Sequence, residues 1–167
     1  MSLSTPHKRE QSKIQSKIQS KNAMGNRAVI RTKKNDIGVY LHWQGGRDSV
    51  RPFLAYCKMK DYRAPEEDSY GWAYLCQVIC NFFNGSGLSI GIDRVKCLDC
   101  KNGDNGVYII KDWEIVGREF YEGEEQDEYD FRKMMHIINS RQPVACQESE
   151  EDINNFVDQY LGITKTE

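Results

Sequence analysis

The chain has 167 residues, of which 39% are hydrophobic and 29% charged, and this composition suits one globular domain with polar ends. Its formal net charge of −2 excludes the strong basic field typical of nucleic-acid-binding proteins, and no apolar run approaches the roughly 20 residues of a membrane span. Six scattered cysteines favour a reduced compartment over a disulfide scaffold, so we expect a cytoplasmic protein.

The first half of the chain predicts a basic tail, two strands and two helices. Residues 1–24 contain a repeat of Ser, Lys, Ile and Gln with little apolar surface to bury, so we expect a mobile tail there. Apolar runs predict strands over residues 27–32 and 38–43. Apolar residues at helical spacing predict helices over residues 49–60 and 69–83.

The second half predicts three strands and two shorter helices. The strands are expected over residues 88–95, 107–110 and 113–120, and the helices over 130–138 and 150–161. The order β-β-α-α-β-β-β-α-α contains hairpins and clustered helices instead of strict alternation. It therefore predicts an α+β fold, a single domain in which helices pack against a mostly antiparallel sheet. The predicted core domain covers residues 25–143, and residues 144–167 form a C-terminal helical extension.

The most informative segment is a strand that runs into a Gly-Gly turn and a new helix. Asp48 and Ser49 are short polar residues of the kind that prefer the N-cap of a helix, so the helix is expected to begin there. The amides at such a helix start, with two arginines beside them, are a typical site for an anion such as phosphate. The residues predicted to bind a ligand in this segment are Trp43, Gly45, Gly46, Arg47, Asp48, Ser49 and Arg51.

Two other interpretations of this turn stay open. Residues 45–49 resemble the SGGxDS loop of the ATP pyrophosphatase families, although Gln44 replaces the leading serine. That resemblance implies ATP binding, but it covers about six residues, and those families have a parallel, doubly wound sheet. The segment could also be a structural turn followed by a capped helix.

Two further groups of residues are candidates for ligand contacts. The polar loop offers Asn102, Asp104 and Asn105, whose side chains can bind a base edge or a ribose, or simply form an ordinary connection. Arg118 is expected between Val116 and Phe120 on one face of an alternating strand, where it could clamp a phosphate, stack on a base or lie over apolar neighbours at the surface.

No pattern of catalytic or metal-binding residues stands out. Cys97 and Cys100 form a CxxC pair, but a structural zinc site needs four ligands, and Cys76 falls on an apolar helix face. Histidine, serine and acidic residues show no known catalytic spacing, so we expect no catalytic residues, no metal and no cofactor. The acidic residues between 119 and 130 are expected to form a solvated rim.

Several motifs together resemble one family of small proteins from phages and mobile elements of Gram-positive bacteria. The likeness covers roughly residues 25–143. The motifs that carry it are Gly38-Val-Tyr-Leu-His-Trp-x-Gly-Gly-Arg-Asp-Ser-Val50, Tyr70-Gly-Trp-Ala-x-Leu-Cys-Gln-Val78, Asn81-Phe-Phe83, Leu88-Ser-Ile-Gly-Ile-Asp93 and Asp104-Asn-Gly-Val-Tyr-Ile-Ile-Lys-Asp-Trp-Glu-Ile-Val116.

This family is similar to the phage anti-Thoeris sponge proteins. The resemblance implies a homo-oligomer in the host cytoplasm that binds a cyclic ADP-ribose signal, or a cyclic oligonucleotide as related members do, and sequesters it without cleavage. Such a protein needs a cradle for a pyrophosphate, a platform for adenine and polar groups for ribose. The Gly45–Arg47 turn, Phe82 or Phe83 with Arg118, and the loop from Asn102 to Asn105 are expected to fill these three roles.

Two functions of other classes compete with this one. The first is an enzyme that cleaves ATP or another nucleotide at the loop from Gly45 to Ser49. The second is an inhibitor that contacts a host defence protein directly, with its acidic stretch imitating nucleic acid. The expected partner in the favoured interpretation is a cyclic nucleotide, with no membrane and no nucleic-acid polymer.

Overall fold

The computed structural model describes residues 25–84, 90–125 and 127–164. The predicted tail over residues 1–24 and the predicted strand start at Leu88 lie outside these ranges. In the described part, a five-stranded sheet has the strand order β3-β2-β1-β4-β5, and only β1 and β4 pair in parallel. The predicted α+β fold with a mostly antiparallel sheet is therefore confirmed.

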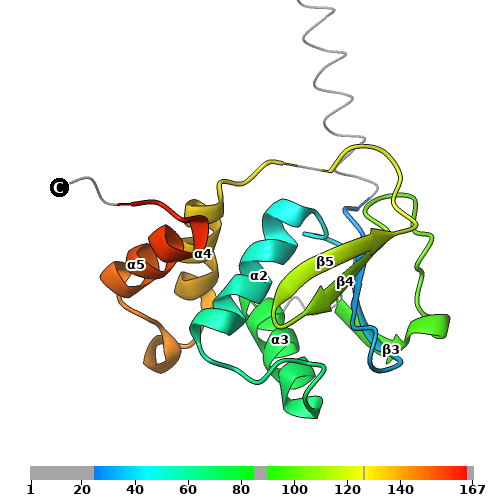
Figure 1. Ribbon diagram of the computed structural model, residues 1–167, viewed down its shortest axis with the longest axis horizontal. Helices are drawn as coiled ribbons and strands as arrows, with labels where there is room; N and C mark the ends of the chain where they lie inside the picture. Colours follow the sequence, from blue (N-terminus) through cyan, green and yellow to red (C-terminus); the bar gives the residue numbers. More distant parts are fainter. Residues whose placement is uncertain (1–24, 85–89, 126, 165–167) are drawn as a thin grey trace, which may run out of the picture.

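The helices lie on one side of the sheet in two successive layers (Figure 1). Helix α2 lies between the sheet and α4, and α5 packs on the far side of α4. None of the helices among the described residues is long and apolar enough to cross a membrane. The strands are β1 (Ala28–Arg31), β2 (Ile37–Leu41), β3 (Ile90–Arg94), β4 (Val107–Lys111) and β5 (Glu114–Glu119). The helices are α2 (Arg47–Met59), α3 (Ser69–Phe82), α4 (Phe131–Arg141) and α5 (Glu150–Leu161), with short 3₁₀ turns η2 (Val95–Cys97) and η3 (Val144–Cys146).

One core joins the sheet to all four helices. The apolar stripe of α2 packs on the sheet face that carries Ile30 and Leu41, and both of these side chains are fully buried. Ile153 and Val157 of α5 belong to the same core, so the C-terminal segment packs with the rest of the described chain. Burial of this kind is the main stabilising contribution to a domain of this size.

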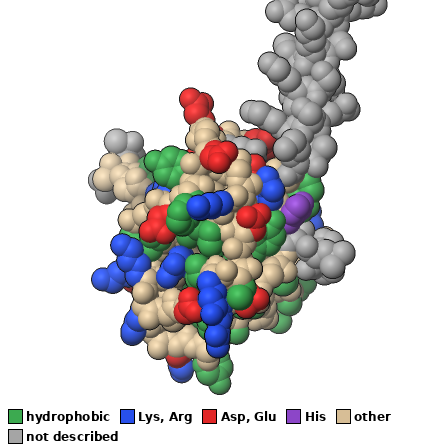
Figure 2. Space-filling view, turned by 90° about the vertical axis from the view of Figure 1, so that its right-hand side faces the viewer, with side chains coloured by type: hydrophobic (Ala, Val, Ile, Leu, Met, Phe, Trp, Pro, Cys, Tyr) green, Lys and Arg blue, Asp and Glu red, His purple; other side chains and the backbone are tan. Residues whose placement is uncertain are grey.

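The opposite face of the sheet is covered by the segment that follows β3. Leu98 lies against Gly38 of β2 and close to Val29 of β1, which is itself fully buried. Figure 2 looks onto the side of the molecule that carries this segment, where basic, acidic and hydrophobic side chains are interspersed.

The start of α2 lies very close to the start of β1. The amide of Gly45 donates a hydrogen bond of 2.7 Å to the carbonyl of Asn26. A Cβ atom at Gly45 would lie 2.4 Å from that carbonyl oxygen and 2.7 Å from the amide nitrogen of Ala28. Glycine is therefore required here by a close approach of two backbones.

We predict that Gly45→Ala lowers the free energy of unfolding by about 1–3 kcal/mol, because the added methyl group would push α2 away from β1. Gly91→Ala is the matched control, since nothing described lies within 4 Å of a Cβ atom at Gly91 in the edge strand β3. Urea denaturation of both variants gives the measurement. Equal stability of the two would show that the backbones separate without strain.

Candidate functional site

Helix α2 begins two residues earlier than predicted and has an uncapped N-terminus. Its N-cap is Gly46, which has extended backbone and makes no side-chain capping bond. The predicted N-cap residues have other partners: Ser49 Oγ donates to Gln44 Oε1 at 2.7 Å, and Asp48 accepts from backbone amides further along the chain. Part of the predicted amide cluster is already engaged, because Ser49 N donates to the Gly46 carbonyl at 3.1 Å and Gly45 N to the Asn26 carbonyl. The amides of Arg47 and Asp48 are left at this electropositive helix end, where an anion could accept from them.

Two arginines converge on one carboxylate at this helix start. Arg47 Nε donates to both carboxylate oxygens of Glu125, at 3.1 and 2.8 Å. Arg118 Nη1 lies 2.8 Å from Oε1 of the same carboxylate. Arg118 Nη2 also donates to the carbonyl of Asn105 at 3.2 Å, which fixes its orientation. The arrangement is the charge-assisted type that arginine forms with carboxylates and phosphates.

Aromatic rings line this cluster. The guanidinium carbons of Arg47 and Arg118 lie 5.9 and 5.2 Å from the ring centre of Tyr108, a residue of β4. Arg118 lies 4.3 Å from the ring centre of Tyr121, which is half exposed. These distances are in the range of cation–π contacts. Tyr108 and Arg118 meet because they are direct neighbours in the register of β4 and β5.

A β-bulge turns Arg118 toward the helices. Ile109 pairs with Gly117 and Ile110 with Ile115, so Val116 has no partner in the register. Ile115 and Arg118 consequently share the face that the helices cover, and Val116 stays exposed. The predicted strict alternation, which placed Arg118 on the same face as Val116, is wrong because one extra residue in a strand reverses the faces beyond it.

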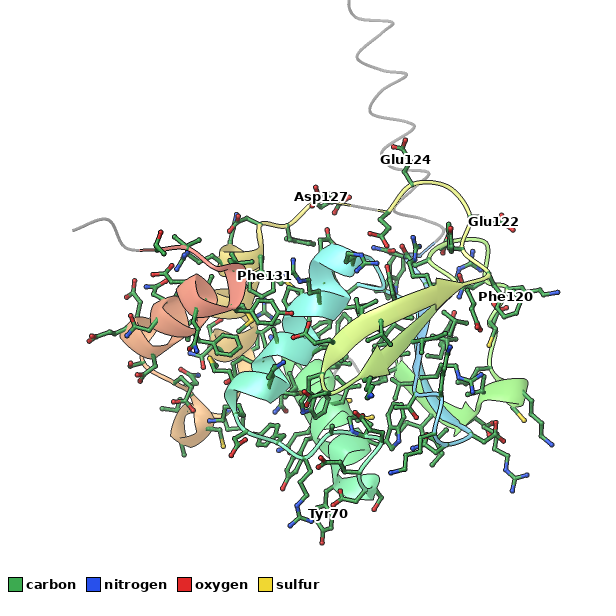
Figure 3. All side chains as sticks on the ribbon, viewed as in Figure 1. Tyr70, Phe120, Glu122, Glu124, Asp127 and Phe131 are labelled. Carbon is green, nitrogen blue, oxygen red and sulfur yellow. The ribbon has the colours of Figure 1, made fainter. Side chains whose placement is uncertain are left out.

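Two hollows adjoin the cluster and share Arg47 and Glu125. The first has a volume of about 440 Å³ and lies between α2 and the segment that leads into α4. The second, about 420 Å³, lies over β5 beside Arg118 and Tyr121. Figure 3 shows Phe131 at the start of α4 beside α2, with Asp127 on the segment that approaches it. The space is sufficient for a ligand of nucleotide size.

Arg51 provides a third guanidinium in the first hollow. Its guanidinium carbon lies 5.2 Å from the ring centre of Phe131 and 5.1 Å from that of Tyr160, and these two rings are stacked. It forms no ion pair with any carboxylate in the described ranges. Its guanidinium group therefore contacts aromatic faces instead of a carboxylate.

Asp48 links α2 to the segment that forms the other side of the first hollow. Its Oδ2 accepts hydrogen bonds from the amides of Glu128 and Tyr129, at 2.6 and 3.2 Å. Burial raises the pKa of Asp48, and the same two backbone hydrogen bonds oppose that rise. These contacts assign Asp48 a structural role at the site, since both amides come from the segment that carries Glu125.

The polar loop holds the fold together at the edge of the site. Asn102 is buried and donates to the carbonyls of Asp99 and Gly106, while its Oδ1 accepts from the amides of Asp104 and Gly106. Asp104 forms an ion pair of 2.7 Å with Arg27. Asn105 Nδ2 donates to Asn26 Oδ1 and to the carbonyl of Arg27. These side chains are engaged within the protein, which favours the structural interpretation of this loop over the ribose contact.

The remaining predicted aromatic residues lie at other positions. Phe82 packs edge-on against Phe53 at 5.2 Å, and Phe83 packs edge-on against Phe82 at 5.3 Å, at the end of α3. Trp43 contacts His42 edge-on at 5.1 Å. The rings that lie over Arg118 are instead those of Tyr108 and Tyr121.

Sequence reasoning missed Tyr108, Tyr121 and Glu125. Tyr108 lies in an apolar strand and was indistinguishable from a core residue. Glu125 belongs to the acidic run that was expected to be a solvated rim, but its side chain is only 26% exposed and pairs with two arginines. The arginines that flank the acidic run in the sequence were the available signal for ion pairs with it. Their spacing alone does not show which arginine pairs with which acid.

No group of three or more His, Cys, Asp or Glu side chains that could hold a metal ion occurs among the described residues. The CxxC pair is split between two environments: Cys97 is exposed, and Cys100 Sγ donates to the carbonyl of Val95 at 3.6 Å. The side chains that line the site carry guanidinium, carboxylate and aromatic groups.

Comparisons of the chain with protein-family models, with curated proteins and with solved structures gave no match. The candidate site is defined by its geometry, which consists of an uncapped helix start and two guanidiniums around one anionic group, over an aromatic ring and between two hollows.

Proposed function

We propose that the protein binds a small phosphorylated ligand of the nucleotide class at the start of α2 and holds it without chemical change. The observation that carries the proposal is the convergence of Arg47 and Arg118 on a single anionic group beside an uncapped helix N-terminus. Guanidinium groups and helix N-termini both favour phosphate oxygens, and arginine can bind two of them at once.

The aromatic residues give the site its nucleotide character. Tyr121 is half exposed in the second hollow, and its ring already lies over a guanidinium. A nucleobase can stack on such a ring while its phosphates lie at Arg47 and Arg118. Phe131 and Arg51 lie on the other side of the anion position, in a hollow that the carboxylates of Asp127 and Asp130 also line.

The groups around the anion position favour binding over catalysis. Asp48 Oδ2 is engaged with two backbone amides, and the Ser49 hydroxyl donates its one hydrogen to Gln44. Burial raises the pKa of Tyr108, so its hydroxyl stays protonated at neutral pH and is available as a donor instead of a base. The site thus supplies charge and hydrogen-bond donors without an evident nucleophile–base pair.

The family resemblance of the sequence narrows the ligand class within this proposal. It points to a cyclic adenine nucleotide of the cyclic ADP-ribose type, sequestered in the host cytoplasm as a counter-measure to an immune signal. A cyclic ADP-ribose carries a pyrophosphate and an adenine, which suit the two arginines and the exposed tyrosine ring. In this proposal the protein acts as a homo-oligomer whose protomers share the ligand.

Arg47→Gln is expected to weaken the binding of cyclic ADP-ribose about 10- to 100-fold, because one charge-assisted contact to the pyrophosphate is lost. Arg63→Gln is the matched control. Arg63 also forms an ion pair, with Asp68 at 2.9 Å, and lies over a tyrosine ring at 5.4 Å, but it is remote from the site. Titration calorimetry measures both affinities. Loss of binding in both variants, or in neither, would contradict the assigned site.

The bound ligand is expected to be recovered unaltered. Protein incubated with cyclic ADP-ribose and then heat-denatured should release the same mass and the same isomer, because no group at the site is placed for nucleophilic attack. Liquid chromatography with mass spectrometry makes the measurement. Turnover that disappears in Asp48→Asn would instead favour the enzyme that the resemblance to ATP pyrophosphatases implies.

A further inference from the structure

Glu125 leaves hydrogen-bond donors of the site unused. Its two oxygens accept from Arg47 Nε and Arg118 Nη1. Arg118 Nε and Tyr108 Oη, by contrast, are buried without any hydrogen-bond partner. Buried polar atoms are nearly always partnered in folded proteins, so two orphaned donors around one carboxylate are unusual.

Tyr108 is the more informative of the two. The residue is fully buried, and its ring lies beneath both guanidiniums. Besides burial, the carboxylates of Glu125 and Asp48 are close enough to help raise its pKa. The hydroxyl therefore belongs to the same electrostatic cluster as Glu125 but does not reach it. An anion with more oxygens than a carboxylate can accept from donors in more directions.

Glu125 also occupies the position that a ligand phosphate would need. The carboxylate and a phosphate cannot share two guanidiniums, because like charges at contact distance repel strongly in a partly buried site. We propose that Glu125 is an internal competitor, a side chain that occupies the anion position in place of the ligand. This inference rests on the function proposed above. The Glu125 carboxylate fills the anion position until a phosphate group that carries more charge and more oxygens replaces it.

This exchange makes Glu125 a specificity-determining residue. A ligand must replace one negative charge held by two guanidiniums. A doubly charged group interacts more favourably with these guanidiniums than the carboxylate does, whereas a singly charged group has no such electrostatic advantage. Diphosphates and phosphate monoesters meet this condition, and carboxylates and single phosphodiesters do not. Once displaced, the Glu125 side chain returns to water, which it already partly contacts.

The competitor also lowers the apparent affinity of every anionic ligand. Apparent affinity falls in proportion to the fraction of molecules whose site is free. If Glu125 fills the site in about 90–99% of molecules, its removal raises affinity about 10- to 100-fold.

Titration calorimetry with inorganic pyrophosphate and with 3′,5′-cyclic AMP, at one fixed salt concentration, tests the proposal on the full chain. Glu125→Gln should bind pyrophosphate about 10- to 100-fold more tightly than the unmodified protein and should gain measurable binding of cyclic AMP. Glu124→Gln is the matched control, because it removes the same charge from the neighbouring exposed residue, whose side chain points away from the molecule (Figure 3).

The outcomes separate this inference from the proposed function. Pyrophosphate binding that is equal in the unmodified protein and Glu125→Gln would overturn the competitor and leave the proposed binding function standing. Equal gains in Glu125→Gln and Glu124→Gln would also overturn it, since net charge alone would then explain both. Absence of binding to any phosphate compound in all three proteins would overturn the proposed function itself.

Tyr108→Phe provides a second test that does not depend on Glu125. Because the hydroxyl has no partner, its removal should leave the unfolding temperature unchanged or higher, while it weakens pyrophosphate binding about tenfold. A lower unfolding temperature with unchanged pyrophosphate affinity would show that the hydroxyl serves the fold and not the anion.

Discussion

The contact between Gly45 and Asn26 fixes the geometry on which the site depends. It docks the start of α2 on the start of β1, and β1 in turn pairs with β4. Asn105 continues the same network, because its side chain binds Asn26 and Arg27 while its carbonyl accepts from Arg118. Arg47 belongs to α2 and Arg118 to β5, and this series of contacts sets the two guanidiniums at the distance where both reach one carboxylate.

The other wall of the site is built by a different set of contacts. Asp48 holds the amides of Glu128 and Tyr129, and Asp130 then caps α4 by accepting from the amide of Lys133 at 3.0 Å. On the far side of α2, Glu114 accepts from Lys58 and from Tyr160 Oη, both at 2.9 Å, and so joins β5 to α5. Arg51 lies within this frame between aromatic rings. The hollow is thus bounded by elements that are packed independently of the anion, as preorganised binding requires.

Most of the fold follows from local patterns, whereas the site depends on contacts between distant residues. Periodicity locates the four described helices and five strands to within a few residues, and the turn chemistry at residues 45–46 identifies the helix start that carries the site. The sequence also indicates Arg47 and Arg118.

The sequence cannot show the bulge at Val116, because a bulge is a property of the pairing between two strands. Nor can it show Glu125 beside Arg47, since these residues are 78 positions apart. The polar loop shows the same limit. Asparagines suited to bind ribose are equally suited to bind backbone, and the fold engages Asn102 and Asn105 with backbone carbonyls.

The position of Glu125 reflects a conflict between stability without ligand and affinity for ligand. Two guanidiniums that converge in a partly buried cluster repel, and Arg118 is only 12% exposed, so water screens its charge poorly. A carboxylate between them relieves that repulsion in the free protein. The same carboxylate must leave the guanidiniums before an external anion can bind. The free energy by which it stabilises the free protein therefore reduces the free energy of binding. A neutral residue at position 125 would reverse the balance, with a tighter site in a less stable fold. The unpaired hydroxyl of Tyr108 supports the same conclusion. A donor buried without a partner raises the free energy of the free protein, and an anion with more oxygens than a carboxylate can offset that cost.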